Sequence, residues 1–418
     1  MSCLYSSARE RYGFDFDIDQ WYQKCSEFTP FTKFIFISKE QASVLKRQHE
    51  HQVLKQEVAQ ISQEEYELLK ILEKEIDDVL QNEKEFFDEE NDISCAFIRL
   101  NTRSPKDAAF SSQKIKQILK RKLYEKSMQY REPALLSNDE KQNDEFISFF
   151  ESQVEVMRFE SGAEALEMMV ASNRVYEDLS IALEHRTDPS DWNVFIAMRK
   201  WIPGHEIGLE FRGFVFERKL CALSQYFDAL YFEDLHNHKD IYLKAIQQFF
   251  EERKHQLPYE NCVLDVMVMR NKESTSDAEE EAPPSAPTLE NLTVQVLEFN
   301  PFNKFTGSAL FSWITDADTL HGRKPFEFRI REAPLPALRS GLQEKASDHE
   351  NGDLTSQQTI MFNLFNVQDD SILQEHGDLI AMVDDFMNND LERINANLRY
   401  VLQKTTKESA LERLALSE

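Results

Sequence analysis

The sequence of 418 residues predicts an α+β fold built on a mainly antiparallel sheet. Strand-like runs follow one another at residues 194–202, 209–217 and 219–227, with connections short enough for antiparallel pairing. Two more strands, at 261–270 and 292–300, form a hairpin once the polar segment between them is set aside. Longer segments carry apolar residues at helical spacing. We therefore expect two lobes, with helices flanking a central sheet.

Charge and cysteine content limit the classes of protein to which the chain can belong. The chain has 48 Lys and Arg against 75 Asp and Glu, a net charge of −27, so it repels phosphate backbones and direct nucleic-acid binding is not expected. Its five cysteines form no CxxC pair, which argues against a zinc ribbon or a disulfide framework. Neither an apolar leader nor a membrane-spanning run is visible. We expect a cytoplasmic protein without a membrane partner.

The first half of the chain is expected to carry two helical inserts. After a predicted strand at 32–38, dense charge and helical spacing predict the first insert at about 40–90. Within it, Ser62-x-x-Glu65 fits a capping box that restarts the helix. We expect an amphipathic helix or helical hairpin packed on the core. A partner-binding coiled coil is the alternative, although the heptad pattern is not sustained.

A predicted strand, CAFIRL at 95–100, and a turn-rich loop, NTRSPKDAAF, precede the second insert at about 111–170. That insert begins with a basic run, KIKQILKRKLYEK, interpreted as a solvated helix face rather than a phosphate or partner patch. Residues 136–145, LSNDEKQNDE, are expected to be an exposed loop, with helices over 146–170.

The chain is divided by these patterns into three parts. Residues 1–185 form the predicted N-terminal lobe with its inserts, and 186–340 the C-terminal lobe. Within the latter, 271–291 is acidic and rich in Pro and Ser, and is expected to be disordered. Residues 341–418 are a linker and a C-terminal helix, whose apolar stripe runs through 371–403.

The hairpin carries a candidate metal site. Asp265 interrupts an apolar strand, and Glu298 and Asn300 alternate at the end of the partner strand, so both lie on one face. If Asp265 faces them, two carboxylates and an amide oxygen converge, which is a ligand set that suits Mg²⁺. The alternative is a strand-end Asp265 and a solvent-facing Glu298.

A second set of residues is mainly cationic and suits a triphosphate. It comprises Arg199, Lys200, Trp201, Glu210 and Arg212 from two strands, and Arg99, Lys106 and Asp107 from the earlier strand and loop. The sequence has neither a GxxxxGK[ST] loop nor a GxGxxG loop, so a P-loop or Rossmann nucleotide site is excluded.

At these residues the sequence resembles the cell division cycle protein 123 family. The matching stretches are FDIDQWYQKCSEFTPFT, FIRLNTRSPKDAAF, VFIAMRKWIPGHEIGLEFRGFVFERKLCALSQYFD, LDVMV and VLEFNPFNKFTGSALFSW. The resemblance implies an atypical ATP-grasp fold with ATP between two lobes. It also implies an ATP-dependent assembly chaperone that binds the gamma subunit of translation initiation factor 2 and so supports translation and cell-cycle entry.

The resemblance assigns a role to each site residue. It implies that ATP is held with Mg²⁺, and that the metal ligands are Asp265, Glu298 and Asn300. Arg99, Ser104, Lys106, Asp107 and Arg212 fall on the phosphate side; Arg199, Lys200 and Trp201 on the adenine and hinge side; and Glu210 on the ribose side.

Three positions depart from the family pattern. Arg99 stands where the family usually has Lys, Lys106 where it has Arg, and Tyr226 where it has Arg. These departures leave open a scaffold that no longer binds nucleotide. The other alternative is an ATP-grasp enzyme, ligase or kinase-like, of unknown substrate, because such a fold commonly activates a carboxylate or phosphate.

Overall fold

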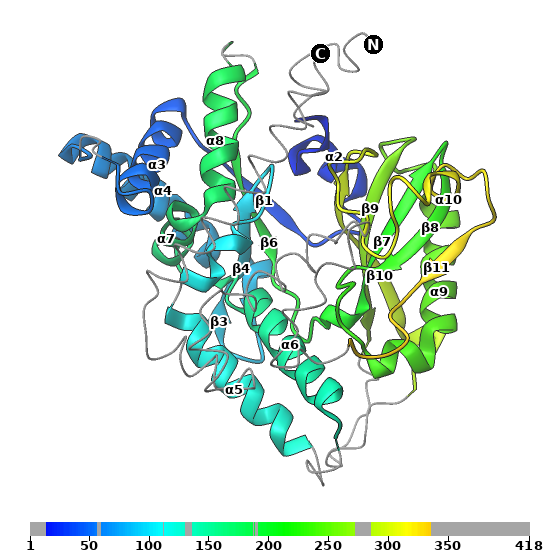
Figure 1. Cartoon of the computed structure of the whole chain (residues 1–418). Helices are drawn as coiled ribbons and strands as arrows, with labels where there is room; N and C mark the ends of the chain where they lie inside the picture. Colours follow the sequence, from blue (N-terminus) through cyan, green and yellow to red (C-terminus); the bar gives the residue numbers. More distant parts are fainter. Residues whose placement is uncertain are drawn as a thin grey trace, which may run out of the picture.

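The computed structural model describes residues 14–56, 60–111, 113–129, 136–186, 188, 191–271 and 286–335. It has two lobes, each built on its own sheet (Figure 1). The helices α3 to α8 surround the first sheet, whereas α2 and α9 pack with the second. The predicted α+β class with mainly antiparallel strands is confirmed.

The first sheet has the order β1-β6-β4-β5, and every neighbouring pair is antiparallel. Its strands are β1 (Thr32–Phe36), β4 (Ala96–Leu100), β5 (Arg158–Phe159) and β6 (Phe195–Lys200). The surrounding elements are α3 (Lys39–Gln52), α4 (Gln63–Asn82), η2 (Lys84–Phe86), η3 (Lys106–Ser111), α5 (Gln113–Gln129), α6 (Asn138–Glu155), α7 (Gly162–Ala171) and α8 (Asn173–His185). A two-stranded ribbon pairs β2 (Phe87–Asp88) with β3 (Ile93–Ser94).

The second sheet has the order β10-β9-β7-β8-β11. Its strands are β7 (Glu210–Phe216), β8 (Lys219–Gln225), β9 (Cys262–Arg270), β10 (Leu292–Asn300) and β11 (Glu327–Arg329). Only the pairing of β11 with β8 is parallel among the described strands of this sheet. The other elements are η1 (Phe14–Phe16), α2 (Ile18–Cys25), η6 (Ile207–Leu209), α9 (Glu233–Arg253), η7 (Leu289–Asn291) and α10 (Ala317–Leu320).

The turn between β7 and β8 sets the register of that hairpin. Glu217 and Arg218 have φ values of 49° and 57°, so both occupy the left-handed region. Two consecutive residues of this kind make the tight turn whose twist matches antiparallel strands. Phe216 therefore pairs with Lys219, and the hairpin continues to Phe211 opposite Gln225.

Two elements belong to a different lobe from the one that their position in the sequence predicts. β6 lies in the first sheet between β1 and β4, although it follows residue 185 in the chain. α2 precedes all the strands, yet Ile18, Trp21 and Cys25 are buried in the core of the second sheet. The boundary between residues 185 and 186 stays a prediction, and the structure shows that the chain crosses between the lobes on both sides of it.

The predicted helical inserts are present, with one error. Ser62 and Glu65 form the capping box at the start of α4, as predicted, and α3 begins with a similar box at Ser38. The loop predicted at 136–145 is wrong, because α6 begins at Asn138. The Ser137 hydroxyl accepts a hydrogen bond from the backbone N–H of Glu140, and the Glu140 carboxylate accepts one from the backbone N–H of Ser137. This box starts a helix within a wholly polar stretch.

The basic run on α5 faces acidic side chains of α6. Lys122 lies 3.4 Å from Glu151 and Lys126 lies 3.5 Å from Asp144, and Arg121 pairs with Glu155. The predicted solvated face is therefore ion-paired with α6, and this use of its charges argues against a phosphate patch.

Three predictions cannot be followed in the structure. Most of the acidic segment 271–291, the linker at 341–370 and the helix at 371–403 lie outside the described residues. Among the described helices, none is long and apolar enough to cross a membrane.

Gly162 is expected to be indispensable at the start of α7. A methyl group there would overlap the backbone carbonyl oxygen of Glu73 on α4, and backbone cannot move aside as a side chain can. We expect Gly162→Ala to lower the free energy of unfolding by about 1–3 kcal/mol, as for other overpacked sites. Urea denaturation measures this. The control is Ala163→Ser at the exposed neighbouring position; equal losses in both variants would contradict the packing argument.

Candidate functional site

The candidate site lies where the ends of the two sheets meet. Arg99 on β4 donates through Nη2 to Glu298 Oε1 on β10, at 2.7 Å. Beside it, Arg199 on β6 donates to the carbonyl oxygen of Leu297 at 2.8 Å and to Thr29 Oγ1 at 2.8 Å. Both arginine side chains are buried. The first sheet therefore supplies cations to a strand of the second.

The register of three neighbouring strands brings the predicted metal ligands together. A bulge between Val296 and Glu298 places Glu298 directly opposite Asp265, and Arg212 lies opposite Asp265 on the other side. Residues directly opposite one another in a sheet share a face, so these three side chains converge. Asn300 follows two positions later on the same face and donates to Asp265 Oδ2 at 3.1 Å. The predicted convergence of Asp265, Glu298 and Asn300 is present.

Asp265 is buried and bound by a bidentate arginine. Arg212 Nε lies 2.8 Å from Oδ1 and Nη2 lies 2.7 Å from Oδ2, while Nη1 donates to the carbonyl oxygen of Gly307 at 2.6 Å. Burial raises the pKa of Asp265 and the arginine lowers it, with a net rise. Burial likewise lowers the pKa of Arg212, but Asp265 outweighs it and the net pKa lies above its usual value.

Glu298 is more open to solvent than Asp265. Its side chain is 29% exposed, against 5% for that of Asp265. Burial raises its pKa, but the charge and hydrogen bond of Arg99 outweigh this, so the net pKa lies below its usual range. Arg99 is further held by the carbonyl oxygens of Leu100, at 3.0 Å, and Thr102, at 2.6 Å.

The donor set at the hairpin fits a hard divalent cation in its chemistry. It offers two carboxylates and an amide from Asp265, Glu298 and Asn300, and oxygen ligands suit Mg²⁺. Among the described residues, His, Cys, Asp and Glu side chains form no cluster of three or more able to hold a metal. A metal here would therefore rely on the amide of Asn300 and on further ligands such as water or phosphate oxygens.

Two charged residues after β4, Lys106 and Asp107, have different roles. Lys106 points to the site, where its Nζ donates to Tyr226 Oη at 3.3 Å. Asp107 is occupied elsewhere, since it accepts from Ser172 Oγ at 2.6 Å and from the backbone N–H of Asn173 at 2.8 Å. It thus stabilises the N-terminal end of α8, where a negative charge is favourable. Ser104 is half-buried in the same loop.

The residues predicted on the adenine and ribose sides do not all belong to this cluster. Lys200 ends β6 at an exposed position, 3.4 Å from Glu85, and Trp201 follows it half-buried. Glu210, at the start of β7, lies 2.8 Å from His205 Nε2. Lys200 and Glu210 therefore interact with partners outside the cluster.

Two residues of the site were not predicted as ligand contacts. Tyr226 joins the cations, because its ring lies 4.9 Å from the Arg212 guanidinium carbon and its hydroxyl accepts from Lys106. The sequence marked Tyr226 only as a departure from a family pattern. Arg174, in the first turn of α8, helps to lower the pKa of Glu298. It lies within an amphipathic helix, where no sequence signal distinguishes it.

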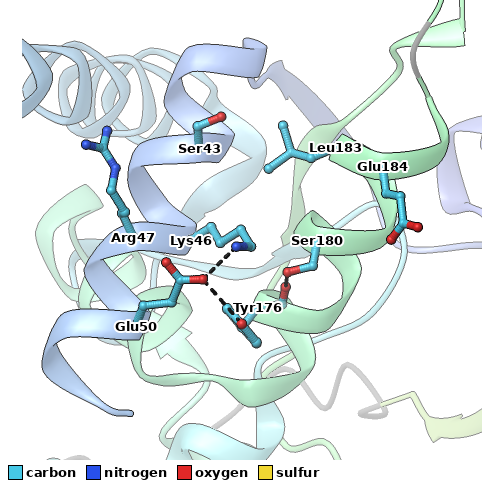
Figure 2. A pocket seen from close by; sticks show the side chains of 8 residues that line it. All are labelled: Ser43, Lys46, Arg47, Glu50, Tyr176, Ser180, Leu183 and Glu184. Carbon is cyan, nitrogen blue, oxygen red and sulfur yellow. Dashed lines mark hydrogen bonds and ion pairs between the residues drawn. The ribbon is translucent and has the colours of Figure 1, made fainter. Parts of the chain in front are cut away.

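A separate pocket of about 610 Å³ lies between α3 and α8 (Figure 2). Two of its charged groups pair within it: Lys46 Nζ lies 2.6 Å from Glu50 Oε1, which also accepts from Tyr176 Oη at 3.3 Å. Arg47 instead pairs with Glu65 outside the pocket. None of the predicted site residues lines this pocket.

Residues 147–351 match the model of the D123 family. The "Translation initiation factor eIF2 assembly protein" of Xenopus laevis is 32% identical over 122 residues, which cover 28% of this chain and 29% of that protein. Its namesake in Danio rerio is 29% identical over 164 residues, which cover 38% and 40%. The matches thus span less than half the length of these curated relatives.

Among solved structures, Cdc123 from Schizosaccharomyces pombe aligns over 78% of this chain and 99% of its own, with 20% identity and a TM-score of 0.48. The family model covers β6 to β11, which include most of the site residues. The chain resembles the cell division cycle protein 123 family, as predicted from its motifs.

The Arg212–Asp265 pair can be tested by a double-mutant cycle. Removing one partner of a buried ion pair leaves the other charge uncompensated, so Arg212→Met and Asp265→Leu are each expected to lower the free energy of unfolding by about 3–5 kcal/mol. The double variant should lose clearly less than the sum of the two, which urea denaturation measures. Strictly additive losses would show that the two side chains do not interact.

Proposed function

We propose that this chain is an ATP- and Mg²⁺-binding assembly chaperone for eukaryotic translation initiation factor 2. In this proposal it binds the gamma subunit, promotes assembly of the three-subunit factor, and thereby supports translation initiation and cell-cycle progression in the cytoplasm. The observation that carries it is the match of 147–351 to the D123 family, together with the printed name of the curated relatives. An atypical ATP-grasp fold is part of the same proposal.

The site supports a nucleotide through its charge. Among the described residues of this cluster, the cations Arg99, Lys106, Arg199 and Arg212 outnumber the carboxylates Asp265 and Glu298, within a chain whose net charge is −27. A locally cationic cluster in an acidic protein selects anions, and arginine forks match phosphate oxygens. We assign the triphosphate to these cations, with Ser104 beside them.

The remaining predicted contacts complete the proposed nucleotide site. Trp201 offers an aromatic face for a base, and Arg199 and Lys200 adjoin it along the end of β6. Glu210, at the start of β7, is proposed on the ribose side. Asp107 acts in this proposal by positioning: its bond to the start of α8 fixes the loop that presents Lys106.

A protein partner is supported by the charge of the whole chain. An excess of acidic side chains attracts a partner with a basic face and raises the rate of association. It disfavours direct contact with nucleic acid.

Nucleotide binding is tested by thermal denaturation with Mg-ATP. A ligand at a hundred times its Kd stabilises the folded state by about 2.7 kcal/mol, so a clear rise in Tm is expected. Asp265→Asn keeps the shape of the side chain but removes its charge, and should reduce the Mg-ATP shift. Lys244→Ala on the exposed face of α9 is the control. The absence of any shift in the unmodified chain would contradict nucleotide binding.

Partner binding is tested separately. The purified chain and the Asp265→Asn and Lys244→Ala variants are incubated with the gamma subunit of translation initiation factor 2, with and without Mg-ATP. We expect capture by the unmodified chain and by Lys244→Ala. Failure to capture the subunit under every condition, with a clear Mg-ATP shift, would retain the nucleotide site and refute the chaperone function.

A further inference from the structure

We propose that the cations of the site bind a polyphosphate without a divalent metal, and that the metal-ligating carboxylates become available only after the polyphosphate has drawn their arginines away. This inference rests on the proposed function, because it takes the triphosphate of a nucleotide as the anion. It goes further by giving the order in which anion and metal bind.

The first observation is that the carboxylates are already bound by cations. Both oxygens of Asp265 accept from Arg212, and Oδ2 also accepts from Asn300. Glu298 Oε1 accepts from Arg99 at 2.7 Å. A metal that approaches these oxygens must first displace two guanidinium groups, whereas an anion can begin on N–H groups that the cations leave free and compete with the carboxylates afterwards.

The second observation is that the cations keep donors for an anion. A guanidinium has five N–H groups, and Arg212 uses one on Nε, one on Nη1 and one on Nη2 in its hydrogen bonds to Asp265 and Gly307. One N–H therefore remains on each terminal nitrogen. Lys106 donates one of its N–H groups to Tyr226 and retains the others.

Tyr226 holds two of these cations on one aromatic side chain. Arg212 stacks on its ring at 4.9 Å, and Lys106, from the other lobe, donates to its hydroxyl at 3.3 Å, with Nζ 5.8 Å from the ring centroid. The face of the ring attracts Arg212 and the hydroxyl holds Lys106, so the two positive charges are kept close despite their repulsion. The arrangement is organised for an anion that bridges both lobes.

Charge decides which ligand is favoured first. Arg99, Lys106, Arg199 and Arg212 outnumber Asp265 and Glu298, so the cluster is positive before any ligand binds. A divalent cation alone would add charge of the same sign in a partly buried place, where such interactions are strong. A polyphosphate compensates the excess, and its oxygens replace the carboxylates as acceptors for Arg99 and Arg212. The carboxylates and phosphate oxygens can then hold the metal together.

The test measures the two ligands separately on the full chain. Inorganic tripolyphosphate is titrated in the presence of EDTA by calorimetry, and Mn²⁺ is titrated without anion by electron paramagnetic resonance. We expect tripolyphosphate to bind without metal, and Mn²⁺ alone to bind at least about tenfold more weakly than it does to the Arg99→Met variant, consistent with the loss of one hydrogen bond to a charged group.

Two variants separate the roles of the cations. Arg99→Met removes a cation that holds a carboxylate, and the part-exposed Glu298 tolerates the loss of its partner. Lys106→Met removes a cation that, among the described residues, has no ion pair with a carboxylate. Both variants should bind tripolyphosphate about 10- to 100-fold more weakly than the unmodified chain. Arg99→Met should strengthen the binding of Mn²⁺ alone more than Lys106→Met does, because Arg99 occupies Glu298 Oε1 directly, whereas Lys106 acts on this carboxylate only through its charge.

The outcomes distinguish this inference from the proposed function. Mn²⁺ binding to the unmodified chain as tight as to Arg99→Met would refute the order of binding. So would binding of ATP that is abolished by EDTA while Mg-ATP still binds. If neither ATP nor Mg-ATP binds but tripolyphosphate does, the anion site stands and the nucleotide function fails. Failure of every anion to bind would overturn both.

Discussion

The buried hydrogen bonds of Arg199 are the contact on which the arrangement of the two sheets depends. They join β6 of the first sheet to Leu297 of β10 in the second and to Thr29, and the ion pair of Arg99 with Glu298 adds to them. Burying charge is unfavourable unless each charge is paired and hydrogen-bonded. The lobes must therefore meet in register, because a shift would leave these arginines without acceptors.

The same constraint explains why the second lobe is a rigid frame for the site. Asp265 lies on the central strand of β10-β9-β7, so its two neighbours present Glu298 and Arg212 on the same face. The buried cores on the sheet hold this register, because a slip by one residue would turn Asp265 toward the apolar side. The β-bulge at Val296 and Glu298 aligns the carboxylates, as bulges next to functional sites commonly do.

The first lobe contributes its groups from two strands and from the segment after β4: Arg99 lies on β4, Arg199 on β6, and Lys106 follows β4. Lys106 is placed by a loop that Asp107 fastens to α8, and Arg103 fastens the same loop through Asp178 at 2.6 Å. This lobe therefore offers one cation on a segment held by polar contacts and two on strands, whereas the other lobe offers Asp265, Glu298 and Arg212 on strands held by packing. Lys106 and Arg212 meet at Tyr226, which gives the two lobes a shared aromatic contact.

The sequence by itself determined the elements and the site's residue types. Alternation in short strands predicted β7 to β10 and the facing of Asp265, Glu298 and Asn300, because the two-residue period is local information. Local chemistry also predicted the restart of the helix at Ser62. It failed at 136–145, because α6 is polar from Asn138 to Glu145, for more than two turns, so apolar periodicity is absent there and only the capping box marks the start of the helix.

Only the tertiary structure decided which charges satisfy one another. Asp107 and Lys106 are neighbours in one cationic loop, yet one stabilises α8 and the other reaches Tyr226. Arg99 and Glu298 are separated by most of the described chain, and their pairing follows from how the two sheets meet. Long-range pairing depends on packing of the whole core rather than on local spacing, and this is why the sequence located the cluster but not its internal partners.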